Sequence, residues 1–227
     1  FWQCMKIKNL KTRLLTSIFL IFLLYISFNY SYILIISLIF ISLISWIEFK
    51  AMIAKIFFKK SFKSRFLKIT IDGTSLLYLT MFSSIVFYGI SQDSFKLIIL
   101  FLISICICSD IGGLLFGKIF KGKKLTKISP NKTISGSIGS FALPLFLIPI
   151  FYSLSQDKFN NFVDMIILVI LVSFICQAGD LFISFLKRKA KVKDTGDLLP
   201  GHGGVLDRID GMLFAIPIGM VSWNFLF

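Results

Sequence analysis

Long apolar runs dominate this chain and limit what it can fold into. Seven of them, each close to the length of a membrane-crossing helix, cover residues 14–29, 31–47, 71–90, 95–116, 138–155, 162–186 and 211–227. With 56% hydrophobic residues and a mean hydropathy of +0.88, a soluble domain of 227 residues could not cover so much apolar surface, whereas lipid can. The sequence therefore predicts an all-α, polytopic integral membrane protein with about seven transmembrane helices.

Basic residues are distributed unevenly between the two sides of such a topology. Of the 25 Lys and Arg, 23 fall on the side of the N-terminus and only Lys96 and Lys158 on the other. Basic segments stay in the cytoplasm, so the N-terminus is predicted to be cytoplasmic. Membrane orientation and anionic lipid also explain the formal net charge of +14, so no nucleic-acid partner is expected. Glu48 is most simply a counter-charge for the basic segment 50–68.

The chain shows no internal repeat and no low-complexity linker, which predicts a single integral-membrane domain over residues 1–227. Residues 110–210 carry the motifs expected at its cytoplasmic face. A basic head followed by an apolar run begins at Met5 and is typical of a natural start. Residues 1–4 are therefore expected to be non-native.

One polar stretch, Ser184–Asp210, separates two of the apolar runs and is the expected location of any chemistry. It holds six Lys or Arg, four Asp and the only His of the chain. In a chain this apolar, such a stretch must face water or an ionic ligand. The mixture of carboxylates and cations suits a metal ion and a polyphosphate beside a bilayer.

Four acids are candidate metal ligands. Asp110 and Asp180 lie inside the ends of apolar helices, where a bare carboxylate costs up to about 2.5–3.5 kcal/mol. Asp207 and Asp210 are three residues apart at the start of the last apolar segment, and such hard carboxylates suit Mg²⁺. Two alternatives stay open: structural pairing with a loop Lys or Arg, and acids favoured by the helix dipole.

Candidate phosphate-binding residues follow Asp180 at helical spacing. Ser184, Lys187 and Arg188 share roughly one face with it, so an acid lies below cations. A plain cytoplasmic anchor of basic residues is the alternative. His202 lies in the PGHGG turn without a His or Cys partner nearby, so a structural or phosphate-contacting role is expected rather than that of a base.

Two upstream motifs carry weaker signals. SPNKTISG, residues 129–136, offers Ser129, Lys132 and Thr133 before a helix start whose N–H groups could face an anion. An ordinary polar helix start is the alternative. DIGGLLFGK, residues 110–118, has glycines that permit close approach to a phosphate or to a neighbouring helix.

These residues resemble the signature of the phosphatidate cytidylyltransferases, or CDP-diacylglycerol synthases. The matching elements are S-x-x-K-R, K-D, P-G-H-G-G and D-R-x-D, present here as Ser184/Lys187/Arg188, Lys193/Asp194, residues 200–204 and Asp207/Arg208/Asp210. The two upstream motifs are also similar to those of the family. Ser135 and Leu114 depart from its usual pattern, which has Glu and an aromatic residue there.

The resemblance implies transfer of CMP from CTP to phosphatidic acid, giving CDP-diacylglycerol and pyrophosphate in phospholipid biosynthesis. It implies Mg²⁺, as one ion or a two-metal centre. The implied catalytic residues are Asp180, Lys193, Asp207 and Asp210, and the implied metal ligands are Asp110, Asp180, Asp207 and Asp210. The implied substrate-binding residues are Ser129, Lys132, Thr133, Ser184, Lys187, Arg188, His202 and Arg208.

The implied location is a bacterial inner membrane, with the site facing the cytoplasm, where acyl chains stay in lipid and the phosphate meets soluble CTP. A homodimer is left open. So are four other functions: a CTP-using polyprenol or dolichol kinase, a cytidylyltransferase for another lipid, a small transporter or channel, and a non-catalytic homologue. A transporter is disfavoured because the acids cluster on one face and no inverted repeat is evident.

Overall fold

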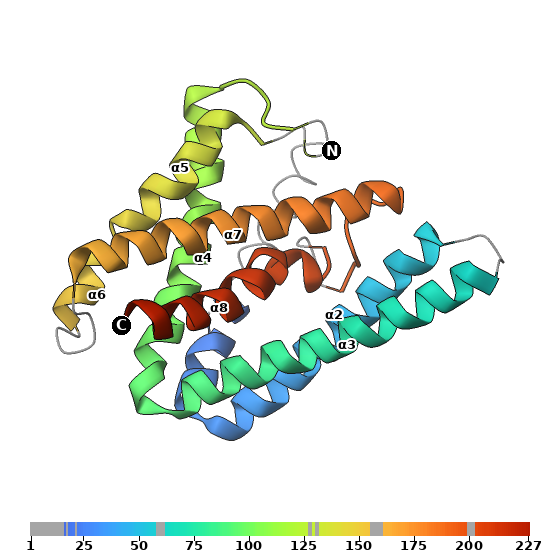
Figure 1. The fold of residues 1–227 in the computed structure, drawn as a ribbon, viewed down its shortest axis with the longest axis horizontal. Helices are drawn as coiled ribbons and strands as arrows, with labels where there is room; N and C mark the ends of the chain where they lie inside the picture. Colours follow the sequence, from blue (N-terminus) through green and yellow to red (C-terminus); the bar gives the residue numbers. More distant parts are fainter. Residues whose placement is uncertain are drawn as a thin grey trace, which may run out of the picture. The chain divides into compact units, whose positions relative to one another are not determined.

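The structure, a computed structural model, describes residues 16, 18–20, 22–57, 62–126, 129, 132–154, 161–198 and 203–227. Its named elements are all α-helices (Figure 1). They are α2 (Ser31–Ile56), α3 (Phe62–Ser91), α4 (Asp93–Phe120), α5 (Ile134–Leu145), α6 (Ile148–Leu154), α7 (Phe162–Lys189) and α8 (Leu206–Leu226). Residues 1–4 and His202 lie outside the described residues.

Six helical segments are long and apolar enough to cross a membrane, with α5 and α6 counted together as Ile134–Leu154. The prediction of an all-α, multi-pass membrane protein is therefore confirmed. The first expected span, residues 14–29, overlaps a shorter apolar helix over Ile18–Asn29. Residues 14, 15, 17 and 21 are outside the described part of the chain, so this span stays a prediction.

Several helices extend well beyond the apolar runs that predicted them. The run expected to end at residue 47 continues as α2 to Ile56, and α3 begins at Phe62 rather than at residue 71. Lys and Arg are good helix formers, so the basic ends stay helical after the apolar stretch stops. Along α2, Lys50 lies over the Trp46 ring, 4.7 Å from its centroid, which shields part of the aromatic face.

Helices α2 and α3 run side by side (Figure 1). Trp46 Nε1 on α2 donates a 3.1 Å hydrogen bond to the carbonyl oxygen of Asp72 on α3. Along the same pair of helices, the hydroxyls of Ser42 and Ser83 are also hydrogen-bonded. Polar side chains thus join two helices whose other faces are largely apolar, as is common between membrane helices.

The expected span 138–155 is two helices, and two prolines explain the break. Pro144 lies in the last turn of α5 and Pro149 in the first turn of α6. Pro149 has no N–H to donate to the carbonyl four residues earlier, and its ring crowds that carbonyl, so the helix cannot continue through it. Phe146 and Leu147 instead donate to the carbonyl oxygens three residues before them, at 3.2 and 3.0 Å.

The chain forms two compact units, each considered by itself. The first comprises Phe1–Phe87 with Leu186–Ile209, and the second Tyr88–Phe185 with Asp210–Phe227. Helices α3, α7 and α8 each contribute residues to both units. The expectation of a single integral-membrane domain stays a prediction.

Glycines bring α4 and α5 into close contact within the second unit. Gly112 on α4 lies against the carbonyl oxygen of Gly139 on α5, and Gly136 on α5 lies against the carbonyl oxygen of Gly113. Gly117 faces the Cα of Gly136. Small residues allow two helix backbones to approach closely in a membrane protein. Of the two interpretations of the DIGGLLFGK glycines, the structure therefore supports helix packing.

We expect Gly112→Ala to destabilise the protein by about 1–3 kcal/mol, because a new methyl group would overlap the backbone of Gly139. Gly73→Ala on α3 is the matched control, since nothing lies within 4 Å of a Cβ placed there. The measurement is the temperature at which half of the detergent-solubilised protein remains monodisperse by size-exclusion chromatography. Equal midpoints for the two variants would contradict this packing.

Candidate functional site

The end of α7 turns the chain sharply toward the connection with α8. Lys191 adopts a left-handed backbone conformation with φ of 57°. Its N–H donates to the carbonyl of Arg188, and that of Val192 donates to the carbonyl of Lys187, at 3.1 and 3.0 Å. This arrangement is a Schellman motif, which satisfies the last carbonyls of a helix and reverses the chain. The polar stretch therefore folds back instead of prolonging α7.

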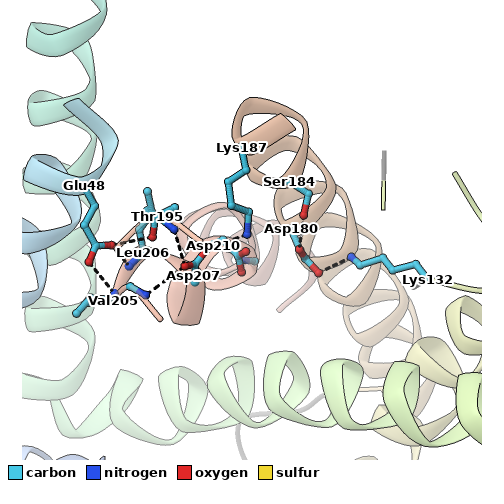
Figure 2. Close-up of polar contacts among 12 residues, drawn as sticks. Glu48, Lys132, Asp180, Ser184, Lys187, Thr195, Val205, Leu206, Asp207 and Asp210 are labelled. Carbon is cyan, nitrogen blue, oxygen red and sulfur yellow. Dashed lines mark hydrogen bonds and ion pairs between the residues drawn. The ribbon is translucent and has the colours of Figure 1, made fainter. Parts of the chain in front are cut away.

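Asp207, in the first turn of α8, is a centre of contacts in this connection (Figure 2). Its Oδ1 accepts from the Lys187 ammonium at 2.7 Å, and its Oδ2 accepts from the N–H groups of Thr195 and Gly204 at 2.8 and 3.2 Å. The Lys187 and Asp207 side chains are only 12% and 7% exposed. Asp207 thus joins the end of α7, the loop and α8 through one carboxylate.

Glu48, the only glutamate in the chain, binds the same loop from α2. Its Oε2 accepts from the Thr195 hydroxyl and the Leu206 N–H, both at 2.9 Å, and its Oε1 accepts from the Val205 N–H at 3.0 Å. The first N–H groups of a helix lack partners within it, so this buried carboxylate caps α8. The interpretation of Glu48 as a counter-charge for segment 50–68 missed this role. The feature of the sequence that could have indicated it is a single acid at the end of an apolar run.

Two glycines make room for the Glu48 carboxylate. A Cβ on Gly196 would lie 2.6 Å from Glu48 Oε1, and one on Gly204 would lie 2.5 Å from Oε2. Gly203 has a φ of +80°, a conformation that L side chains rarely adopt. The glycines at these positions are therefore required by close approach and backbone conformation. We name Glu48, Lys187, Thr195, Asp207 and residues 203–206 the loop cluster.

A second cluster lies in the other unit and is built around Asp180. Its Oδ2 pairs with the Lys132 ammonium, and its Oδ1 accepts from the Ser184 hydroxyl at 3.2 Å, one turn further along α7 (Figure 2). The Lys132 and Asp180 side chains are 28% and 27% exposed, so this pair is more open to solvent. We name these three residues the Asp180 cluster.

Backbone pairing brings Lys132 into this position. The connection between α4 and α5 folds back on itself, with the Leu125 N–H donating to the Lys132 carbonyl at 2.8 Å. The Ile134 N–H donates to the Lys123 carbonyl at 2.9 Å. Asp180 paired with a Lys is the structural alternative that the sequence left open, and the structure shows that pairing.

Thr133 caps the start of α5. Its Oγ1 accepts from the Gly136 N–H at 3.1 Å, and the Ser135 hydroxyl accepts from the Gly122 N–H at 3.2 Å. A side-chain oxygen in this place satisfies one of the unpaired donors of a helix start. Ser135, which departs from the family pattern, thus ties α5 to the segment that follows α4. Capping accounts for Thr133 without a ligand, and its predicted substrate contact stays a prediction.

One further polar contact joins α5 to α7. The Ser137 hydroxyl donates a 2.6 Å hydrogen bond to Gln177 Oε1, one turn before Asp180. Gln177 Nε2 is buried and finds no partner within the described part of the chain. The spacing of the sequence motifs did not single out either residue.

The remaining predicted site residues differ in their exposure. Asp210 is 8% exposed and its Oδ1 accepts from the Gly211 N–H at 2.8 Å, while Ser129 is half-buried. Four charged side chains are exposed: Asp110, Arg188, Lys193 and Arg208. Their assigned roles stay predictions.

The metal-binding role of the four predicted acids stays a prediction. Within the described ranges, no group of three or more His, Cys, Asp or Glu side chains is placed to hold a metal ion. The Asp180 and Asp207 carboxylates instead accept from lysines and other donors. Mg²⁺ commonly takes one or two carboxylates and fills its other positions with phosphates and water. The Asp180 and Asp207 carboxylates therefore suit a Mg²⁺ ion that takes most of its ligands from phosphate and water.

Comparison with known proteins identifies the family of this chain. The sequence model of the cytidylyltransferase family matches residues 1–226. The chain belongs to the cytidylyltransferase family. This confirms, at the level of the family, the resemblance found in Ser184–Asp210.

Several relatives in the cytidylyltransferase family are named phosphatidate cytidylyltransferase. That of Rickettsia typhi is 39% identical over 142 residues, covering 60% of this chain and 62% of the relative. Those of Helicobacter pylori and Staphylococcus epidermidis are 37% and 38% identical over 127 and 133 residues, or 56% and 58% of this chain. The chain spans 62%, 47% and 50% of the length of these three relatives.

We expect replacement of the lysine to destabilise the protein more in one Lys–Asp pair than in the other. Lys187→Met leaves the buried Asp207 carboxylate without its cation, so we expect a loss of about 3 kcal/mol, as for other broken buried pairs. Lys132→Met opens the more exposed pair with Asp180 and should cost less than about 1 kcal/mol. Thermal midpoints in detergent would test the order, and a larger loss for Lys132→Met would contradict it.

Proposed function

We propose that this protein transfers CMP from CTP to phosphatidic acid, producing CDP-diacylglycerol and pyrophosphate. The observation that carries the proposal is the polar connection between α7 and α8, where a Lys–Asp pair, further acids and exposed cations follow an apolar helix. Membership of the cytidylyltransferase family and the names of the relatives support it.

In the proposed reaction, a phosphate oxygen of the lipid attacks the α-phosphorus of CTP. The new P–O bond joins the lipid phosphate to CMP, and the bond between the α-phosphorus and its bridging oxygen breaks. That oxygen leaves with pyrophosphate. The nucleophile is already an anion, so the protein need not remove a proton. Its task is to align two highly charged groups and to stabilise the charge that moves to the leaving oxygen.

The cations of the two clusters suit the phosphates. Under this proposal, Lys187, Arg188 and Lys193 bind the triphosphate, and Lys132 contacts a phosphate of either the nucleotide or the lipid. Ammonium and guanidinium groups form strong, charge-assisted hydrogen bonds to phosphate oxygens. Lys187 is held at a fixed place by Asp207, so little freedom is lost when it binds an anion.

Mg²⁺ belongs to the proposal as well. Asp180 and Asp207, with Asp210 and Asp110, are its proposed protein ligands, and the ion would neutralise negative charge on the phosphates. The residues already described would bind and orient both substrates, while the loop cluster keeps its own geometry through hydrogen bonds within the chain.

The proposed site faces the cytoplasm of a bacterial cell, at the inner membrane. Twenty-three of the 25 Lys and Arg fall on the side predicted to be cytoplasmic, which is also where CTP is found. The acyl chains of the substrate remain in lipid, so an enzyme with six membrane-crossing helical segments meets its lipid substrate directly.

Purified protein in detergent should convert CTP and phosphatidic acid to lipid-linked CMP and stoichiometric pyrophosphate when Mg²⁺ is present. Turnover should stop on addition of a chelator. Thin-layer chromatography of labelled lipid and an enzymatic pyrophosphate assay measure the two products. CDP release with phosphorylation of an added polyprenol would identify a lipid kinase instead, and no nucleotide turnover by folded protein would indicate a non-catalytic homologue.

Asp207→Asn should abolish this turnover while the protein still inserts and extracts normally. The substitution keeps the shape of the side chain but removes the charge that pairs with Lys187. Asp93→Asn is the control, because it removes the same charge from an exposed residue in the first turn of α4. Near-normal activity in Asp207→Asn would remove Asp207 from the site.

A further inference from the structure

We infer that Glu48 is a positioning residue for the proposed reaction. It lies on α2, far in sequence from every motif that suggested the function, and it acts through the loop that leads to Asp207. The inference rests on the proposed function for its kinetic consequence. Its structural part, that Glu48 holds the loop, can be tested on its own.

Two carboxylates hold the same pieces of backbone. Thr195 gives its N–H to Asp207 and its hydroxyl to Glu48, so one residue is fixed from two directions. At the other end of the loop, Gly204 donates to Asp207, while Val205 and Leu206 donate to Glu48. The Glu48 and Asp207 carboxylates thereby hold both ends of the segment between residues 195 and 206.

Glu48 is matched to this place in length and charge. Its two oxygens receive three donors, and the residue is 7% exposed, so water cannot readily replace it. Gly196 and Gly204 lie so close to the carboxylate that a methyl group at either position would displace it.

A single residue, Leu206, connects Glu48 to Asp207 in the proposed site. Leu206, whose N–H binds Glu48, directly precedes Asp207, whose carboxylate binds Lys187. Loss of the Glu48 carboxylate would leave the Val205 and Leu206 N–H groups without their acceptor and loosen the first turn of α8. Asp207 and Lys187 would then no longer be held in one geometry, and misplacement by about 1 Å can cost about 100-fold in rate.

The test compares Glu48→Gln with Trp46→Phe in the whole 227-residue chain. Glu48→Gln keeps the size of the side chain but replaces one acceptor oxygen with a donor. Trp46→Phe removes a hydrogen bond from the same helix, that to the Asp72 carbonyl, and leaves the loop untouched. We expect kcat/KM for CTP to fall by at least about tenfold in Glu48→Gln and to stay within about twofold in Trp46→Phe.

A double variant separates positioning from general destabilisation. Thr195→Val removes the hydroxyl that Glu48 accepts from while keeping the shape of the side chain. If both residues act through one loop, their effects on kcat/KM are coupled, and the double variant loses clearly less than the product of the two single losses. Independent, multiplicative losses would overturn the inference.

Hydrogen exchange supplies the readout that does not depend on activity. The amides of Val205 and Leu206 should exchange faster in Glu48→Gln than in the parent, with no change in Trp46→Phe. Unchanged exchange at these amides would overturn the structural part of the inference. If the parent protein shows no cytidylyl transfer, the proposed function fails while exchange still tests Glu48. If the parent is active and Glu48→Gln equals Trp46→Phe in kcat/KM, the positioning role fails.

Discussion

Two buried carboxylates hold the connection between α7 and α8, and the loop cluster depends on them. A backbone N–H group that is buried away from water needs an acceptor within the protein. Glu48 and Asp207 accept from four backbone N–H groups, those of Thr195, Gly204, Val205 and Leu206. The same bonds fix Asp207 against Lys187, so the requirement for a stable loop and that for an ordered charge pair are met together.

The apolar runs of the sequence predicted the helices well but not their ends. Hydropathy marks where contact with lipid stops, whereas a helix continues as long as its backbone geometry is favourable. For this reason α2 reaches Ile56 and α3 starts at Phe62, both inside the basic segment. The break between α5 and α6 was readable in principle, since Pro149 cannot continue a helix, but the apolar composition of 138–155 concealed it.

The spacing of residues within one helix predicted some of the contacts in the site. It could not predict contacts between segments that are distant in sequence. Asp180 and Ser184, four residues apart on α7, are hydrogen-bonded as helical spacing indicated. The bond between Thr195 and Glu48 joins residues 147 positions apart, and no periodicity within one segment could indicate it. The glycines were ambiguous for the same reason: Gly112 and Gly204 each make room for an atom of another segment, and a sequence does not show which one.

The two Lys–Asp pairs would respond differently to an incoming phosphate. An anion that drew Lys187 away would leave Asp207 with two backbone donors, which cannot follow the ligand. An anion that drew Lys132 away would leave Asp180 with the Ser184 hydroxyl, its other contact within the described residues. Under the proposed function, Asp207 would therefore keep its place through substrate binding, whereas Asp180, which is also the more exposed, would be the freer of the two to accept a new cation.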